Sequence, residues 1–199
     1  MKKIILPAIA IATIIIYAYQ QNQKNSKSVP TVSVPEFGQV SEFSLTNQAN
    51  ETFNSTQMLG KVWLVSFMFT TCHGPCPMMN QKMAALQNDL IGLKSFHQVS
   101  ISMDPETDTP EQLRAYGKKF QAEDSRWTFL TGEKAKIISI AKDIFKLPAG
   151  EDPNMHSTRF VLIDQKGKIR GYFDSLSPDA LIKLREQARL LHDSDQKSS

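Results

Sequence analysis

The chain has 199 residues, with 23 Lys and Arg, 20 Asp and Glu, and a formal net charge of +3. Its length accommodates one ordinary domain plus a further segment. Three lysines and no acidic residue fall within residues 1–24, so residues 25–199 are formally neutral. A neutral domain without a basic patch or a basic-aromatic stripe argues against nucleic acid as a partner.

The N-terminal segment 1–24 is predicted to be a signal anchor or a signal peptide. Two lysines precede an apolar run over residues 4–19, and a polar stretch follows it. The run is near the lower length limit for a spanning helix, and no A-x-A cleavage site is evident. An uncleaved membrane anchor is therefore favoured over a cleaved, secreted form. By the positive-inside rule, Lys2 and Lys3 stay in the cytoplasm and the domain faces the periplasm or an equivalent extracytoplasmic space.

Residues 25–38 are predicted to be a linker, followed by the domain at 39–192 and a polar tail at 193–199. Loose alternation of apolar residues over 39–59 indicates a short N-terminal β-hairpin. Residues 61–69 are apolar almost throughout, which indicates a central strand buried on both faces.

Directly after this strand come the only two cysteines of the chain, in the run Thr71-Cys72-His73-Gly74-Pro75-Cys76-Pro77. Proline suits the first helical turn, so we expect Cys76 at or near a helix N-terminus. Unpaired N–H groups and the positive end of the helix dipole favour a thiolate there, which predicts a lowered pKa for Cys76. The spacing also brings both sulfurs to one face of a turn, where they can share a metal ion or form a disulfide. A purely structural disulfide is the alternative, although a bond closing so short a loop stabilises little.

The rest of the domain alternates helices and strands. Helical spacing predicts helices over 77–93, 110–120, 134–145 and 178–191, and apolar runs predict strands over 97–103, 127–131, 158–163 and 168–173. Thr109, followed by Pro110 and by Gln112 three residues on, fits a capping box. This order predicts an α/β thioredoxin-like fold with a mostly parallel central sheet, helices on both faces and an antiparallel hairpin at its edge.

His156 is the candidate third ligand for a metal held by Cys72 and Cys76. It lies where an irregular stretch over 147–155 enters a strand. In a thioredoxin-like fold, the loop before that strand faces the dithiol. The other three histidines are expected to lie outside the ligand set: His73, pointing to solvent, His97 and His192.

Two thiolates and one imidazole form a soft to borderline donor set. Such a set suits copper, as Cu(I) or Cu(II), better than magnesium, calcium or manganese. Zinc normally takes a fourth ligand, and iron–sulfur clusters usually require four cysteines. Three nearby methionines carry thioether sulfurs, but their helical spacing beside a core strand indicates packing: Met78, Met79 and Met83.

The chain resembles the Sco/SenC family of anchored, thioredoxin-like proteins over about residues 37–191. Three separated motifs carry the resemblance: the dithiol run at 69–77, the Asp-Pro-Glu-Thr-Asp-Thr-Pro run at 104–110, and His156 before an apolar strand. Many members carry an aspartate two residues before the histidine, whereas this chain has Asn154.

The resemblance implies copper bound by Cys72, Cys76 and His156. It also implies delivery of copper to the dinuclear copper centre of a cytochrome c oxidase subunit or another cuproprotein, or reduction of that subunit's cysteines. Asp104 and Asp108, in the middle motif, are interpreted as turn and capping residues, with a position beside the site as the alternative.

The leading hypothesis is a copper chaperone rather than an enzyme, with a thiol reductase as a further partner. The alternative is a metal-independent thiol–disulfide oxidoreductase or redox sensor in which Cys72 and Cys76 form the redox-active pair. A peroxiredoxin would carry P-x-x-x-T-x-x-C. It is disfavoured because this chain has Val65 and Phe69 at the Pro and Thr positions.

Overall fold

A single strand, β4 (Val62–Met68), runs through the centre of the fold, and all seven of its residues are buried. The computed structural model describes residues 34–196, so the predicted anchor, the linker up to residue 33 and residues 197–199 lie outside it. Side chains of β4 alternate between two apolar clusters, one on each face of the sheet: Val62, Leu64 and Met68 in one, Trp63, Val65 and Phe67 in the other.

The predicted helices and strands are present, with ends that shift by a few residues. The strands are β1 (Gly38–Gln39), β2 (Ser44–Asn47), β3 (Thr52–Asn54), β4, β5 (Phe96–Ser102), β6 (Trp127–Thr131), β7 (Arg159–Ile163) and β8 (Lys168–Asp174). The helices are η1 (Ser55–Met58), α2 (Cys76–Asp89), α3 (Pro110–Lys119), α4 (Lys134–Ser139), the π-helical turn η2 (Ile140–Ile144) and α5 (Pro178–Gln196).

The eight strands form one mixed sheet in the order β1-β8-β7-β4-β5-β6-β2-β3. Only β4 with β5 and β5 with β6 pair in parallel among the described strands, so the prediction of a mostly parallel sheet is wrong. The difference arises at β7, which is antiparallel to β4. The irregular segment 146–158 carries the chain back to the edge where β6 ended, and β7 therefore starts from that edge. The N-terminal hairpin β2–β3 is confirmed, and it extends the sheet beyond β6.

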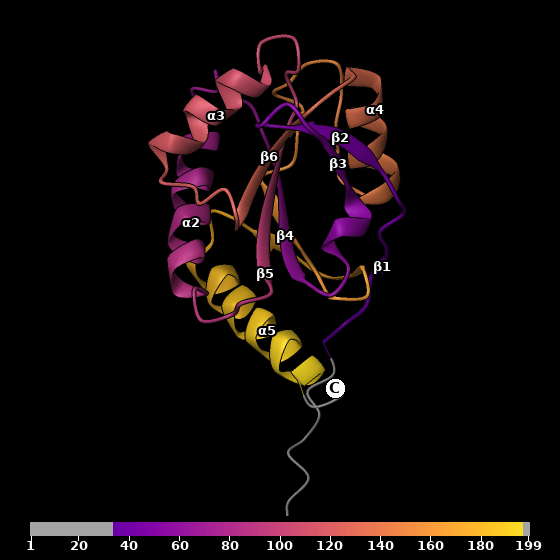
Figure 1. Cartoon of the computed structure of the whole chain (residues 1–199), viewed down its shortest axis with the longest axis vertical. Coiled ribbons are helices and arrows are strands. Elements are labelled where there is room, and N and C mark those ends of the chain that lie inside the picture. The colour runs from indigo at the N-terminus through magenta and orange to yellow at the C-terminus, as the bar shows by residue number, and fades with distance from the viewer. Residues whose placement is uncertain (1–33, 197–199) are drawn as a thin grey trace, which may run out of the picture. The chain divides into compact units, whose positions relative to one another are not determined.

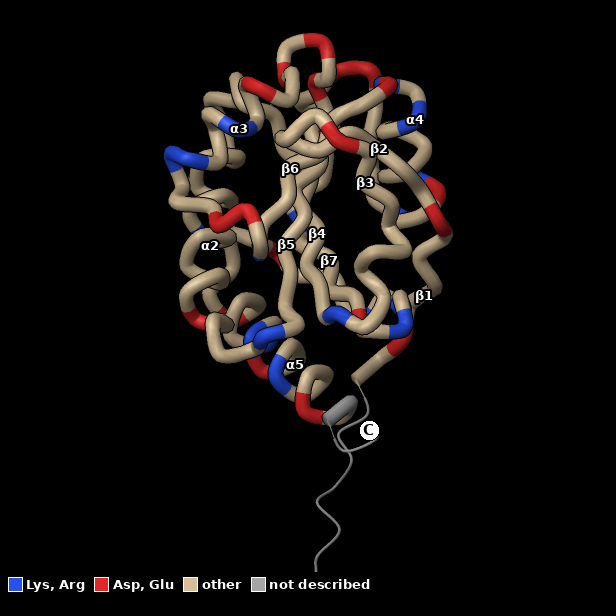
Figure 2. Tube along the Cα trace, viewed as in Figure 1, with Lys and Arg blue, Asp and Glu red and all other residues tan. Residues whose placement is uncertain are grey.

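Helices cover both faces of this sheet (Figure 1). On one face, α2, α3 and α5 pack over an apolar cluster that includes both cysteines. On the other, α4 and η2 pack over a second cluster around Trp63 and Phe145. Acidic and basic residues are interspersed along the trace (Figure 2). Within residues 34–196, no helix has the length and apolar character needed to cross a membrane.

The predicted start of α3 is confirmed in detail. Thr109 Oγ1 accepts a hydrogen bond from the Gln112 N–H at 3.3 Å, and Pro110 opens the helix. This cap fixes where the loop after β5 ends, and that loop contributes to the candidate site described below.

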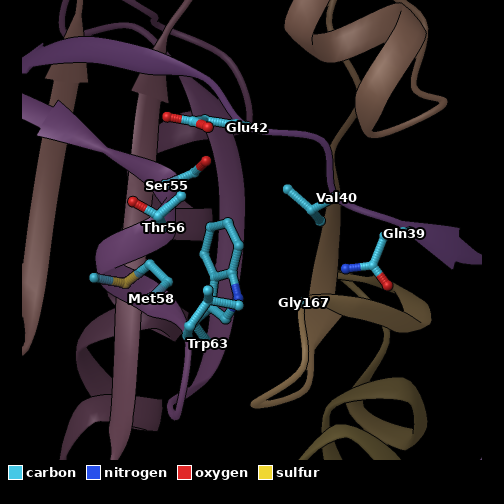
Figure 3. A pocket seen from close by; sticks show the side chains of 9 residues that line it. Gln39, Val40, Glu42, Ser55, Thr56, Met58, Trp63 and Gly167 are labelled. Atoms are coloured by element: carbon cyan, nitrogen blue, oxygen red, sulfur yellow. The ribbon is translucent and has the colours of Figure 1, made fainter.

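A cavity of about 190 Å³ lies beside the start of β4 (Figure 3). Trp63 lines it, and the indole Nε1 of Trp63 has no hydrogen-bond partner in the part of the chain that the structure describes. The cysteines follow the opposite end of β4, which at about 3.3 Å per residue lies roughly 20 Å away. The cavity is therefore separate from the candidate site.

His97 is buried within β5 and contributes to stability rather than to the site. Its side chain is 6% exposed, and its Nε2 pairs with Thr128 Oγ1 at 2.8 Å. Burial, reinforced by the charges of Lys61 and Arg126, lowers the pKa of His97 to about 4. The folded protein therefore holds this imidazole neutral at pH values where an unfolded chain protonates it.

We predict that stability falls as the pH drops from about 6.5 to about 4, because the unfolded state then binds the extra proton. The His97 contribution to this loss is on the order of 3 kcal/mol. Urea unfolding at pH 7 and at pH 4.5 should show a smaller stability difference for His97→Gln than for the wild type. The exposed His73 offers a matched control, and His73→Gln should keep the wild-type dependence. Equal pH dependence in His97→Gln and wild type would contradict the prediction.

Candidate metal centre

The two cysteines lie at the junction between β4 and α2. Cys76 is the first residue of α2, directly after Pro75, and its side chain is fully buried. Cys72 lies in the preceding loop with 8% of its surface exposed. Both are free thiols. The predicted order of strand, dithiol and helix is confirmed.

His156 reaches this dithiol from the segment before β7. Its Nε2 lies 3.5 Å from Cys76 Sγ, and its Nδ1 lies 3.0 Å from the carbonyl oxygen of Ser157. A carbonyl only accepts, so Nδ1 carries the proton and Nε2 presents its lone pair to the sulfur. Burial lowers the pKa of His156, which favours the neutral, ligating form. The Phe69 ring packs against the imidazole in a T-shaped arrangement, with an angle of 87° between the ring planes and centroids 5.8 Å apart.

Strand pairing explains why these distant residues meet. In the antiparallel pair β4–β7, Val65 stands opposite Val161 and Trp63 stands opposite Ile163. Residues that follow β4 therefore lie beside residues that precede β7. The loop carrying Cys72 follows β4, and the segment carrying His156 precedes β7, so the sheet itself brings them together.

The expected lowering of the Cys76 pKa is wrong. Burial of the sulfur and the hydrogen bond from Cys72 raise the pKa of Cys76 to about 12, outweighing the backbone N–H groups that favour the thiolate. The helix N-terminus is present, but the thiol beside it is closed off from water. A bare thiolate is unfavourable here, whereas a thiolate neutralised by a bound cation avoids that cost.

Within residues 34–196, no three His, Cys, Asp or Glu side chains already stand as a ready-made metal cluster. Cys76 Sγ lies 3.5 Å from His156 Nε2, and the neighbouring Cys72 thiol contributes to the raised pKa of Cys76. The donor types, two sulfurs and a neutral imidazole nitrogen, fit copper.

A family model described as SCO1/SenC matches residues 35–189. The chain belongs to the SCO1/SenC family. A SCO1 protein homolog from Bacillus subtilis is 34% identical over 66% of this chain and 71% of its own length. BsSco, a member of the Sco family of cytochrome c oxidase assembly proteins with a disulfide switch, is 26% identical, with a TM-score of 0.73 over 81% of this chain and 98% of its own. Copper-bound yeast Sco1 has the same fold, with 23% identity and a TM-score of 0.64 over 78% of this chain and 90% of its own.

In this SCO1/SenC domain, Asp108 anchors the cysteine loop. Its fully buried carboxylate accepts hydrogen bonds from the Thr70 N–H at 3.0 Å, from the Thr70 hydroxyl, and from the Ser102 hydroxyl at 2.5 Å. The Asp108 N–H closes the turn with the Asp104 carbonyl at 2.8 Å, as expected of a turn residue, whereas the expectation of a capping role is wrong because Thr109 provides the cap. Burial raises the pKa of Asp108. Thr70 lies two residues before Cys72, so this carboxylate ties the loop to the end of β5.

A second buried polar side chain, that of Asn80, holds the backbone of Cys76. Asn80 Nδ2 donates to the Cys76 carbonyl at 3.0 Å and to the Tyr116 hydroxyl at 3.1 Å. Burial raises the pKa of Tyr116 to about 12, so the phenol stays neutral. This contact joins α3 to the first turn of α2. Neither Asn80 nor Tyr116 was singled out from the sequence, because each fits an ordinary amphipathic helix.

The remaining candidates divide as follows. Met79 and Met83 are buried core residues as predicted, but Met78 is 52% exposed and does not pack in the core. His73 is exposed, as expected.

Asn154 donates from its backbone and side chain to Asp152 Oδ1, both at 2.9 Å, rather than to His156. Asp104 is confirmed as a turn residue, since its carbonyl accepts from the Asp108 N–H at 2.8 Å.

We predict that Asp108→Asn destabilises the domain by about 1–3 kcal/mol, because one of the three donors around this carboxylate loses its acceptor. Asp104→Asn, in the same loop, is the matched control and should stay within about 0.5 kcal/mol of the wild type. Urea unfolding gives the free energies, and hydrogen exchange at Thr70 and Cys72 reports loosening of the loop. Equal stability of the two variants would show that the Asp108 contacts are unimportant.

Proposed function

We propose that this protein carries copper as its cargo, held by Cys72, Cys76 and His156. The observation that carries the proposal is the His156 Nε2 lone pair directed at Cys76 Sγ from 3.5 Å, beside a second free thiol. Family membership supports it, as does the copper bound by yeast Sco1, which shares the fold. The recipient we propose is the copper-bearing subunit of cytochrome c oxidase or another cuproprotein, because BsSco belongs to a family of oxidase assembly proteins.

Each residue has a distinct part in this proposal. The two thiols give up their protons as copper enters, and the copper charge offsets the burial that otherwise keeps Cys76 protonated. The Ser157 carbonyl holds the His156 ring in the tautomer that can bind a metal. His156 lies in the irregular segment 146–158, so it is the ligand that an incoming partner can replace most easily. By the same proposal, residues 1–24 tether the domain on the extracytoplasmic side of a membrane.

Copper binding tests the ligand set directly. Reduced protein is titrated anaerobically with Cu(I) against a chromogenic chelator. We expect one-to-one binding that is lost in Cys72→Ser and in Cys76→Ser, and that weakens by roughly tenfold or more in His156→Ala. His73→Ala removes an exposed imidazole between the two cysteines and should bind like the wild type. If His156→Ala also binds like the wild type, His156 is not a ligand.

Thiol–disulfide exchange is a second candidate function, favoured by the two free thiols on either side of the helix start and by the disulfide switch of BsSco. The more exposed Cys72 would attack a partner disulfide and form a mixed disulfide. Cys76 would then attack the Cys72 sulfur of this mixed disulfide and release the partner's thiolate, which leaves a Cys72–Cys76 disulfide in this protein and two reduced thiols in the partner.

The two functions differ in what they require of His156. If the protein is a thiol–disulfide oxidoreductase, its metal-free form should reduce a disulfide-containing peptide from the oxidase copper subunit. This exchange should be abolished by either Cys→Ser change but retained in His156→Ala. For a copper carrier we expect slow exchange in the wild type, since the Cys76 thiol is buried. Rapid catalytic exchange by wild type and His156→Ala alike would favour the oxidoreductase.

A further inference from the structure

A groove of about 580 Å³ lies next to the segment that carries His156. Its apolar walls come from Leu147 and Pro148, which follow η2, and from Tyr172 on β8. Phe37 extends this wall, with its ring edge-on to Tyr172 at a centroid distance of 5.6 Å. The volume is within the range of pockets that hold ligands in other proteins.

Two cations, Lys146 and Arg159, line the same groove, and no acidic residue does. Both side chains are exposed, and neither forms an ion pair with any residue from 34 to 196. Ion pairs within residues 34–196 involve only the cations Lys168, Arg170 and Arg185, so what sets Lys146 and Arg159 apart is their place beside one apolar wall. The groove therefore joins an apolar wall to two uncompensated positive charges. That combination complements an anionic group next to an apolar side chain.

A short chain of hydrogen bonds connects the groove to the dithiol. The Arg159 N–H donates to Ser157 Oγ at 3.1 Å, and the Ser157 carbonyl accepts from His156 Nδ1 at 3.0 Å. His156 Nε2 in turn lies 3.5 Å from Cys76 Sγ. Ser157 both lines the groove and fixes the His156 ring, so a molecule bound there lies within one residue of the proposed copper ligand.

We propose that this groove binds an acidic segment of the protein that receives the copper. Carboxylates of that segment pair with Lys146 and Arg159, and a neighbouring aromatic or large aliphatic side chain packs against Leu147, Pro148 and Tyr172. The identity of the partner as a copper recipient rests on the proposed function; the chemistry of the segment rests on the groove. Two cations beside an apolar wall suit one short peptide segment, whereas a nucleic acid or a membrane surface calls for a broader basic area.

Docking in this position would couple recognition to copper release. A segment that contacts Arg159 and Ser157 would disturb the hydrogen bond between the Ser157 carbonyl and His156 Nδ1, which holds the imidazole ring. The recipient's own ligands would arrive where His156 is replaced, while Cys72 and Cys76 still hold the ion. The groove thus supplies specificity at the point of transfer.

The first test measures docking without copper. The metal-free, reduced protein is titrated into a fluorescent twelve-residue peptide of alternating Glu and Asp around a central Trp, and into a counterpart with Lys at every acidic position. We expect the acidic peptide alone to bind, with an affinity that falls as salt rises. Lys146→Glu/Arg159→Glu should weaken its binding roughly tenfold or more. Lys118→Glu/Lys183→Glu, which makes the same charge change at exposed sites on α3 and α5, should bind like the wild type.

The second test measures transfer. Copper-loaded protein is mixed with the copper-accepting domain of the host's oxidase subunit, and the rate of transfer is followed. The groove variant should keep the wild-type Cu(I) affinity but transfer roughly tenfold more slowly at limiting acceptor. The Lys118→Glu/Lys183→Glu control should transfer at the wild-type rate. His156→Ala should lose copper affinity but still bind the acidic peptide, which separates failure of the groove from failure of the copper site.

The proposal would be overturned by equal binding of the acidic and basic peptides, by equal losses in the two double variants, or by transfer unaffected by Lys146→Glu/Arg159→Glu. Self-association of the protein that is lost in the groove variant, without peptide binding, would assign the groove to a second copy of this chain and would also overturn it.

Discussion

The antiparallel pairing of β7 with β4 is the constraint on which the candidate site depends. It places the residue before β7 at the same edge of the sheet as the residue after β4, so His156 meets Cys76. A parallel β7 would begin at the opposite edge, roughly 20 Å away at the usual rise of a strand. The irregular segment 146–158 is what makes the antiparallel direction possible, because it returns the chain to that edge. The candidate ligands therefore come together only because this stretch gives up regular helix or strand hydrogen bonding.

Burial sets the chemistry of the dithiol as much as proximity does. Cys76 lies at a helix N-terminus, yet it behaves as a closed-off thiol because no water reaches it. The groups that hold it are themselves buried and polar: Asp108 fixes the loop through Thr70, and Asn80 links the Cys76 carbonyl to Tyr116. These contacts fix the loop and the helix start that carry the two sulfurs, and a buried sulfur gains most from a ligand that carries positive charge.

Local signals in the sequence predicted most of the fold and singled out Cys72, Cys76 and His156, which the structure brings to one end of β4. The double-sided burial of β4, the cap at Thr109 and the dithiol at a helix start are all encoded within a few neighbouring residues. Strand direction is not, because the pairing of β7 depends on how the segment 146–158 crosses the molecule. The role of Asp108 was hidden for a similar reason: a loop aspartate beside a helix cap fits a local interpretation, and only the tertiary structure brings Thr70 to it. The predictions of a buried Met78 and of a lowered Cys76 pKa are wrong for a shared reason. Both depend on how far a side chain is exposed to water, which residue spacing alone does not determine.

The π-helical turn η2 has a consequence for how this domain tolerates changes in length. The Phe145 N–H bonds to the carbonyl of Ile140, five residues back, so the turn holds one residue more than an α-helix would. Deleting one residue there would return the turn to regular α-helix and would leave the residues on either side close to their present orientation. Phe145 and Leu147, which are buried directly after this turn, would still face the second apolar cluster. A single-residue deletion should therefore be tolerated better in this turn than in the regular helix α2, where it would rotate every downstream side chain by about 100°.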